Sequence, residues 1–109
     1  IAVSSGNSFV HETESQVILN GSYNINFTMD LVLKDTGLFD DLAKKLGAPL
    51  EISPKVVEIF KDGQKKYGSR AWSSMIVKRM EDLNNIDFRA SGFPEELTDN
   101  EPEEKGYEI

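Results

Sequence analysis

The sequence predicts a single all-α domain, a bundle of about four main helices followed by a non-helical, acidic C-terminal tail. The chain has 109 residues, which is enough for one hydrophobic core and too few for two. Up to residue 85, apolar residues recur at the period of a helix, and no segment keeps the alternation typical of a strand. Residues 86–109 instead contain Pro94, Pro102 and many acidic residues, which favour a non-helical tail.

The first predicted helix begins after Asn7 or Ser8, both good N-cap residues, and ends near residue 19. One face of this helix is formed by Phe9, Val10, Thr13 and Val17. Residues 20–23, Asn-Gly-Ser-Tyr, have the chemistry of a turn, and residues 24–28 are short enough to be extended. The chain begins at Ile1 rather than Met, and residues 1–7 read as the end of a helix running into a turn. We therefore expect a piece of a longer protein.

The second predicted helix covers most of residues 28–47 and ends at Gly47, a residue type that readily adopts the left-handed terminating conformation. Lys44 and Lys45 occupy its last turn, where positive charge complements the helix dipole. Ser53 and Pro54 have the types expected at the N-cap and first turn of a third helix. This helix ends at Gly68, and its apolar positions are Val56, Ile59, Phe60 and Tyr67.

A fourth helix is expected to begin with Ser69 as its N-cap and to fray at residues 84–85. Its apolar residues are Trp72, Met75, Ile76, Met80 and Leu83. The tail that follows is acidic, but it also carries the apolar residues Phe88, Phe93 and Tyr107. We expect these residues to anchor the tail on the surface of its own domain or of a neighbouring subunit, instead of leaving it solvated.

Composition excludes several classes of function. The chain has no cysteine, which rules out disulfides, thiolate catalysis and Cys-based metal sites, and a lone histidine gives no metal site. No apolar run approaches the roughly 18 residues of a membrane span. Residues 1–10 have neither a basic start nor a long apolar stretch, so we expect no signal peptide and a cytoplasmic protein.

The net charge of −7 is concentrated in the tail. Residues 95–109 contain seven acidic residues and one lysine, whereas the rest of the chain is nearly balanced. Neither part has the basic stripe that nucleic-acid binding requires, so we expect no nucleic-acid partner.

The apolar stripe of the second helix is interrupted by polar residues. It runs through Leu31, Leu38, Leu42 and Leu46, with Phe39 beside it. Helical spacing places Asp35 on the same, inward face and Lys34 at its border. A buried carboxylate needs a hydrogen bond or a cation, and Gly37 costs about 1 kcal/mol relative to alanine inside a helix.

Two explanations for these three residues remain open. In a structural explanation, Asp35 caps a neighbouring helix, Gly37 permits close packing and Lys34 extends outward. In a functional one, Lys34 directs its ammonium at an anionic or polar ligand, and Gly37 leaves room for that ligand or for another domain.

The stretch NFTMDLVLKDTGLFDDLAKKLGAPL resembles the C-terminal helical domain of the β-hydroxyacid dehydrogenases, the 3-hydroxyisobutyrate dehydrogenase family related to 6-phosphogluconate dehydrogenase. That family carries a phenylalanine before a Lys-Asp-x-Gly signature, then an apolar helix and a Gly-x-Pro turn. The matching positions are Phe27, Lys34, Asp35, Gly37, Leu38, Asp41, Gly47, Pro49 and Pro54. The resemblance covers residues 1–85 and leaves residues 86–109 as an acidic extension. Departures are Phe39, where the family has a small residue, and residues 68–75 (GSRAWSSM), where relatives often have an acidic one.

The resemblance implies an enzyme that oxidises a short β-hydroxy acid with NAD or NADP. It also implies a separate N-terminal Rossmann domain that holds the dinucleotide and is absent from this chain. In this reading the chain contributes no catalytic residue. Lys34 approaches the nicotinamide end of the cofactor, Phe27 forms a wall of the pocket, and Asp35 orients a neighbouring group. Relatives form dimers or tetramers through such domains, so a homo-oligomer is expected, and this chain alone should be inactive.

Other notable residues have mainly structural interpretations. Asp41 is expected to be structural, and His11 to be an ordinary surface or core histidine. Ser73 and Ser74 have no base near them in sequence, which favours a helix start over nucleophilic catalysis. Gly63 falls on the apolar side of the third helix and indicates close helix contact. Trp72 and Met75 are expected in a core or an interface. The alternative from another functional class is a stand-alone helical interaction module whose acidic tail binds a basic partner.

Overall fold

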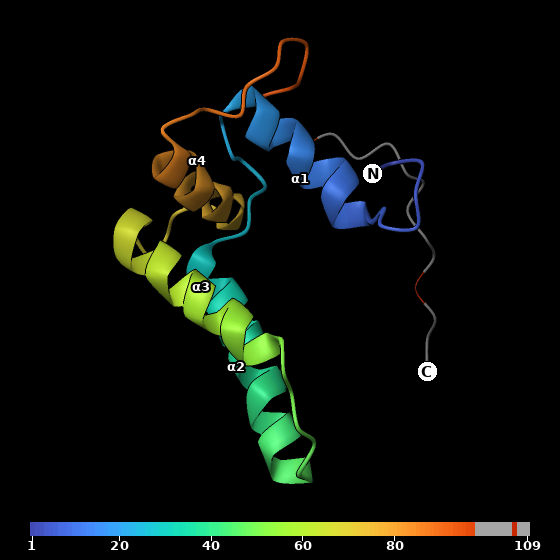
Figure 1. Ribbon diagram of the computed structural model, residues 1–109, viewed down its shortest axis with the longest axis vertical. Helices are drawn as coiled ribbons and strands as arrows, with labels where there is room; N and C mark the ends of the chain where they lie inside the picture. The colour runs from blue at the N-terminus through green and yellow to red at the C-terminus, as the bar shows by residue number, and fades with distance from the viewer. Residues whose placement is uncertain (98–105, 107–109) are drawn as a thin grey trace.

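The computed structural model describes residues 1–97 and residue 106, and it confirms the all-α class for them. The elements are α1 (Phe9–Asn20), α2 (Met29–Leu46), α3 (Ser53–Tyr67), the short 3₁₀ helix η1 (Ser73–Val77) and α4 (Lys78–Asn84). In the described residues, extended pairing is limited to two isolated bridges, Asn24 with Glu96 and Thr28 with Trp72. Figure 1 shows α2 and α3 side by side as a hairpin that projects away from α1 and α4.

The predicted ends of α1 and α2 are confirmed. Ser8 caps α1, because its hydroxyl accepts the backbone N–H of His11 at 3.0 Å. Gly21 and Gly47 end α1 and α2 with φ values of 93° and 66°, in the left-handed region that glycine adopts without strain. Residues 1–7 form turns.

Ser53 is not the N-cap of α3, contrary to the prediction. It is the first helical residue, and Ile52 occupies the cap position without a side-chain hydrogen bond. The Ser53 hydroxyl instead donates to the carboxylate of Asp40 on α2 at 2.5 Å. A contact between the two helices of the hairpin has therefore replaced the expected local cap.

The predicted start of the fourth helix at Ser69 is also wrong. Helical structure begins at Ser73, first as η1 and then as α4. The backbone carbonyls of Ser69 and Ala71 accept the first N–H groups of α2, from Asp30 at 3.1 Å and Met29 at 3.0 Å. Because the first N–H groups of a helix have no partner inside it, residues 69–71 serve as a backbone cap for α2 and are unavailable for a helix of their own.

The hairpin packs through a face of α2 different from the predicted one. Met29 and Ala43 are the buried residues of α2. Leu31 of the predicted stripe is half-buried, but the rest of the stripe faces outward: Leu38 is 64% exposed and Leu46 73%. Asp35, expected on an inward face, has a side chain that is 57% exposed, so that expectation is wrong.

Gly63 confirms the predicted close contact of α3. A Cβ at this position would lie 2.7 Å from Cδ1 of Ile76 and 3.2 Å from Sδ of Met29. The missing side chain lets α2, α3 and η1 meet at one point. The last turns of α3 are also joined to α4, because Asp62 accepts from Arg79 at 2.6 Å and Tyr67 donates to Asp82 at 2.6 Å.

Residues 86–97, called the strap below, lie on their own domain, which is one of the two placements predicted for the tail. The strap passes the C-terminal end of α1, as the orange trace in Figure 1 shows. The Ala90 N–H donates to the carbonyl of Leu19 at 3.0 Å, Asn20 donates to the carbonyl of Phe93 at 3.0 Å, and Ser22 donates to that of Glu95 at 2.5 Å. The anchor Tyr107 and the acidic residues from Asp99 onward lie outside the described residues.

Candidate functional site

Lys34 and Asp35 lie together on the outer surface of α2. The Lys34 side chain is 61% exposed, and its ammonium lies 3.3 Å from the carboxylate of Asp35. Lys34 and Leu38 are one helical turn apart, so they share the exposed face of α2. The ammonium is therefore accessible, and its charge is only weakly compensated, because an exposed ion pair contributes little.

Gly37 lies beside this pair and faces open space. A Cβ built there meets nothing within 4 Å. The close-packing explanation for Gly37 thus finds no support within the described residues. Gly37 weakens the helix, and because it has no side chain, another group can approach the backbone at this turn.

Phe27 precedes α2 and lies in a different environment. It lines a hollow of about 190 Å³ together with residues of α1, Ile25 of the linker between α1 and α2, and Leu97 of the strap. Its carbonyl accepts the backbone N–H of Ser73 at 2.8 Å, which fixes the linker against η1. Lys34 does not line this hollow. Lys34 lies five residues into α2, about 7.5 Å of helical rise beyond Met29, whereas Phe27 precedes the helix.

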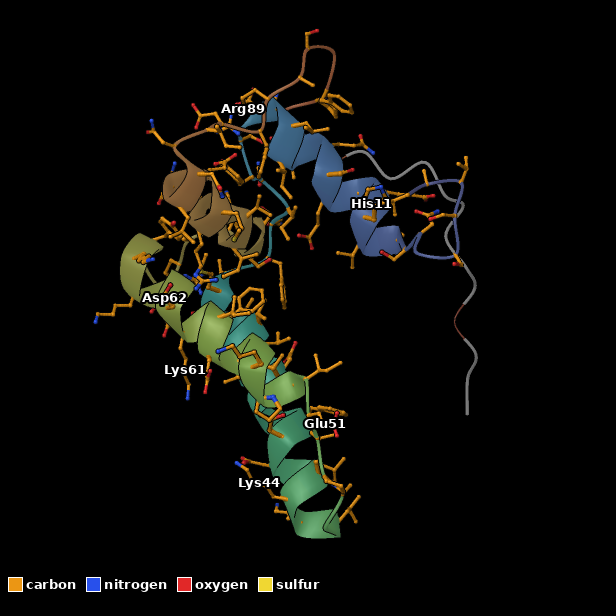
Figure 2. All side chains as sticks on the ribbon, in the orientation of Figure 1. His11, Lys44, Glu51, Lys61, Asp62 and Arg89 are labelled. Carbon is orange, nitrogen blue, oxygen red and sulfur yellow. The ribbon has the colours of Figure 1, made fainter. Side chains whose placement is uncertain are left out.

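Ser73 and Ser74 are buried structural residues, in agreement with the predicted helix start. Ser73 is the first residue of η1, and the Ser74 hydroxyl donates to the carbonyl of Tyr23 at 2.6 Å. His11 lies in the first turn of α1 and is half-buried. Figure 2 places it far from Arg89, near the opposite end of that helix. Within the described residues, no group of three or more acidic or histidine side chains is arranged to hold a metal.

A buried ionic cluster that the sequence did not indicate links the strap to the core. Glu81 on α4 is 1% exposed and accepts from Tyr23 at 2.5 Å, from the Phe88 N–H at 2.9 Å and from Arg89 at 2.7 Å. Arg89 also donates to the Tyr23 hydroxyl at 2.9 Å and lies 5.3 Å from the centre of its ring. Helical spacing gave no signal for this cluster, because its members come from a linker, a helix and a segment assigned to the tail.

The pKa values of this cluster reflect burial opposed by hydrogen bonding. Burial alone would raise the pKa of Glu81, but the hydrogen bonds from Tyr23, Phe88 and Arg89 hold it below its usual value. Burial and the neighbouring carboxylate raise the pKa of Tyr23 to about 12. The cluster is thus built around an ionised Glu81 and a protonated Tyr23.

Comparison with known protein families identifies the family of this chain. Residues 1–80 match the family described as NAD-binding of NADP-dependent 3-hydroxyisobutyrate dehydrogenase. The chain belongs to this family. The match supports an NAD(P)-dependent dehydrogenase and a nicotinamide cofactor, and it ends within α4, before the strap. Comparison with curated proteins gives no significant match.

In this 3-hydroxyisobutyrate dehydrogenase-type chain, Lys34 and Gly37 lie on the exposed side of α2. Phe27 lines a separate hollow, so the structure does not bring it together with Lys34. The 109 residues contain no Gly-x-Gly-x-x-Gly loop, the element that cradles a pyrophosphate in Rossmann domains. In the described part of the chain, no helix has the length and apolar character to cross a membrane.

Proposed function

We propose that this chain is the helical domain of a cytoplasmic NAD(P)-dependent enzyme that oxidises a short β-hydroxy acid. It would work with a Rossmann domain that holds the dinucleotide, and its own share would be to contribute Lys34, Phe27 and Asp35 to the cofactor site. The observation that carries this proposal is the coincidence of Lys34 and Gly37 on a face of α2 that nothing in the described residues covers.

The cost of Gly37 supports a role outside this domain. A glycine inside a helix lowers stability by about 1 kcal/mol relative to alanine, and the open space around Gly37 offers no compensating packing. A ligand or a second domain that approaches the backbone at this turn would provide that compensation. Lys34, one turn away, would then direct its charge at the same approaching group.

Apolar residues next to Lys34 support an interface on the same face. Leu38, Phe39, Leu42 and Leu46 are all more than half exposed. Their spacing makes a continuous stripe along α2, and such a stripe on a helix typically packs against another protein surface. We assign this stripe to contact with a partner subunit or with the Rossmann domain in a homo-oligomer.

A bound nicotinamide cofactor would accept the hydride of the oxidised alcohol. The residues of this chain would position the cofactor and exclude water from it. Lys34 would hold an anionic or polar group of the ligand, Asp35 would limit the freedom of the Lys34 side chain through their 3.3 Å contact, and Phe27 would shield the reacting end from solvent. Since these are positioning roles, the isolated 109-residue chain should catalyse no hydride transfer.

The decisive experiment substitutes Lys34→Ala in an enzyme that also contains the Rossmann domain. We expect kcat/KM to fall roughly 10- to 100-fold, as is typical when one charged contact to the reacting complex is removed, with little change in thermal stability. Lys45→Ala is the matched control, because Lys45 is also an exposed lysine of α2 but lies three turns further on. Equal kcat/KM values for the two variants would refute the role of Lys34.

A further inference from the structure

Two neighbouring hollows lie beside the linker that leads to α2: the first between the linker, α1 and Leu97, the second between the linker, Trp72 and the strap. The first, of about 190 Å³, is lined on one side by Phe9 and Glu14 of α1 and on the other by Phe27. The second, of about 550 Å³, is lined by Asn24, Asn26, Trp72 and Glu96. Ile25 and Leu97 line both hollows, which together are called the α1 groove below.

We propose that the α1 groove is a binding site for a small organic cation. Its walls combine aromatic rings with carboxylates, which is the chemistry that recognises quaternary nitrogen and positively charged heteroaromatic rings. Phe9, Phe27 and Trp72 supply the rings, and Glu14 and Glu96 supply the negative charge. Among the described residues that line the groove there is no lysine, arginine or histidine, so an anionic ligand would find no counter-charge.

Glu14 is half-buried beside the aromatic rings of the first hollow. Burial raises the pKa of its carboxyl group. No hydrogen bond or ion pair to this side chain occurs within residues 1–97. A cation in the first hollow would supply the missing interaction and would stabilise the ionised carboxylate.

The strap completes this site, so the site depends on residues beyond the part matched to the family. Glu96 and Leu97 form the strap side of the groove, and the Asn24–Glu96 bridge holds this part of the strap against the linker. The Glu81–Arg89 pair and the Ser22–Glu95 hydrogen bond fix the strap at earlier points. The resulting groove is specific to a chain that continues past residue 85 in this way.

Choline, a quaternary ammonium compound, is compared with its neutral isostere 3,3-dimethylbutan-1-ol. Binding to the 109-residue chain is measured by fluorescence of Trp72, the only tryptophan, and by NMR shifts of Ile25 and Leu97. We expect choline to bind about fivefold more tightly than its neutral counterpart.

Charge-removing variants locate the site. Glu14→Gln and Glu96→Gln should each weaken binding of choline severalfold, because each removes a carboxylate at nearly constant volume. Glu95→Gln is the matched control: it makes the same charge change in the adjacent strap residue, whose side chain does not line the groove. The proposal is overturned if choline gives no saturable signal, if 3,3-dimethylbutan-1-ol binds equally well, or if Glu14→Gln binds choline as wild type does. Phe27 belongs to both proposals, whereas Lys34 does not line the groove, so the Lys34→Ala assay remains a separate test of the proposed function.

Discussion

The hydroxyl of Tyr23 donates a 2.5 Å hydrogen bond to the buried carboxylate of Glu81, and this contact connects the α1–α2 linker to α4. Tyr23 reaches this position from a left-handed backbone conformation, with φ of 55°, which is uncommon for a bulky residue. Arg89 of the strap closes the cluster by contacting both side chains. The linker, the helix and the strap are therefore held by one small ionic group.

Glu81→Gln should destabilise the domain by roughly 1–3 kcal/mol, because it leaves Arg89 without its buried counter-charge while preserving side-chain volume. Urea unfolding followed by circular dichroism measures the change. Asp87→Asn is the control, since Asp87 is exposed and lies 3.9 Å from Arg89, where an ion pair contributes little. If both variants lose the same amount, the Tyr23–Glu81–Arg89 cluster does not hold the strap.

The same carboxylate predicts a pH dependence of stability. The pKa of Glu81 is lowered in the folded protein from an ordinary value of 4.5, so the folded state binds this proton less readily than the unfolded state. Its contribution is fully present above about pH 4.5 and is lost as the pH falls through the lowered value. Asp30, Asp62 and Asp82 also have lowered pKa values and add to the acid sensitivity.

Comparison with the Glu81→Gln variant isolates the contribution of Glu81 to the pH dependence of the free energy of unfolding. The free energy of unfolding of wild type and variant, measured from about pH 7 to about pH 3, should differ most near neutrality and converge in acid. A difference that stays constant across this range would show that the ionisation of Glu81 does not contribute.

Gly37→Ala and Gly63→Ala should have opposite effects on stability. Alanine at position 37 meets open space and should stabilise the isolated chain by about 0.5–1 kcal/mol through helix propensity. At position 63 the added Cβ falls 2.7 Å from Ile76, and overpacking of about 1–3 kcal/mol should offset that gain or exceed it. Thermal unfolding of the two variants tests this order, and a Gly63→Ala variant more stable than Gly37→Ala would contradict the packing described for α3.

Leu42→Glu should separate folding from association. The residue is 54% exposed, so the isolated chain should keep its stability within about 0.5 kcal/mol. If the stripe on α2 is an interface, the enzyme containing the Rossmann domain should shift to a smaller species in analytical ultracentrifugation. Lys61→Glu, on the exposed surface of α3, should leave the assembly unchanged. An unchanged sedimentation profile for Leu42→Glu would exclude Leu42 from any subunit contact.

Local chemistry in the sequence was sufficient to predict much of the fold. The ends of α1 and α2 depend on the side chain of Ser8 and on the backbone conformations of Gly21 and Gly47. Because these effects are local, the residue types alone were enough to predict where the helices end. Gly63 could be assigned to a helix contact because its place on the apolar side of α3 was visible from spacing.

Features that depend on tertiary contact could not be predicted in the same way. The apolar stripe of α2 predicts an inward face, but periodicity shows only that one face is apolar and not what covers it. Ser69 looks like a helix cap, yet its carbonyl is used by α2. The candidate site was predictable only as far as the Lys34 signature, because the α1 groove requires Phe9, Phe27 and Leu97 to converge from distant segments.

The junction of Met29, Gly63 and Ile76 lies at the first residue of α2. The 18 residues of α2 extend about 27 Å from that junction. A rotation of the hairpin of roughly 5° about this junction would displace the distant Gly47–Ile52 tip by about 2 Å. Substitutions that change the volume of the junction should therefore displace residues that they never touch.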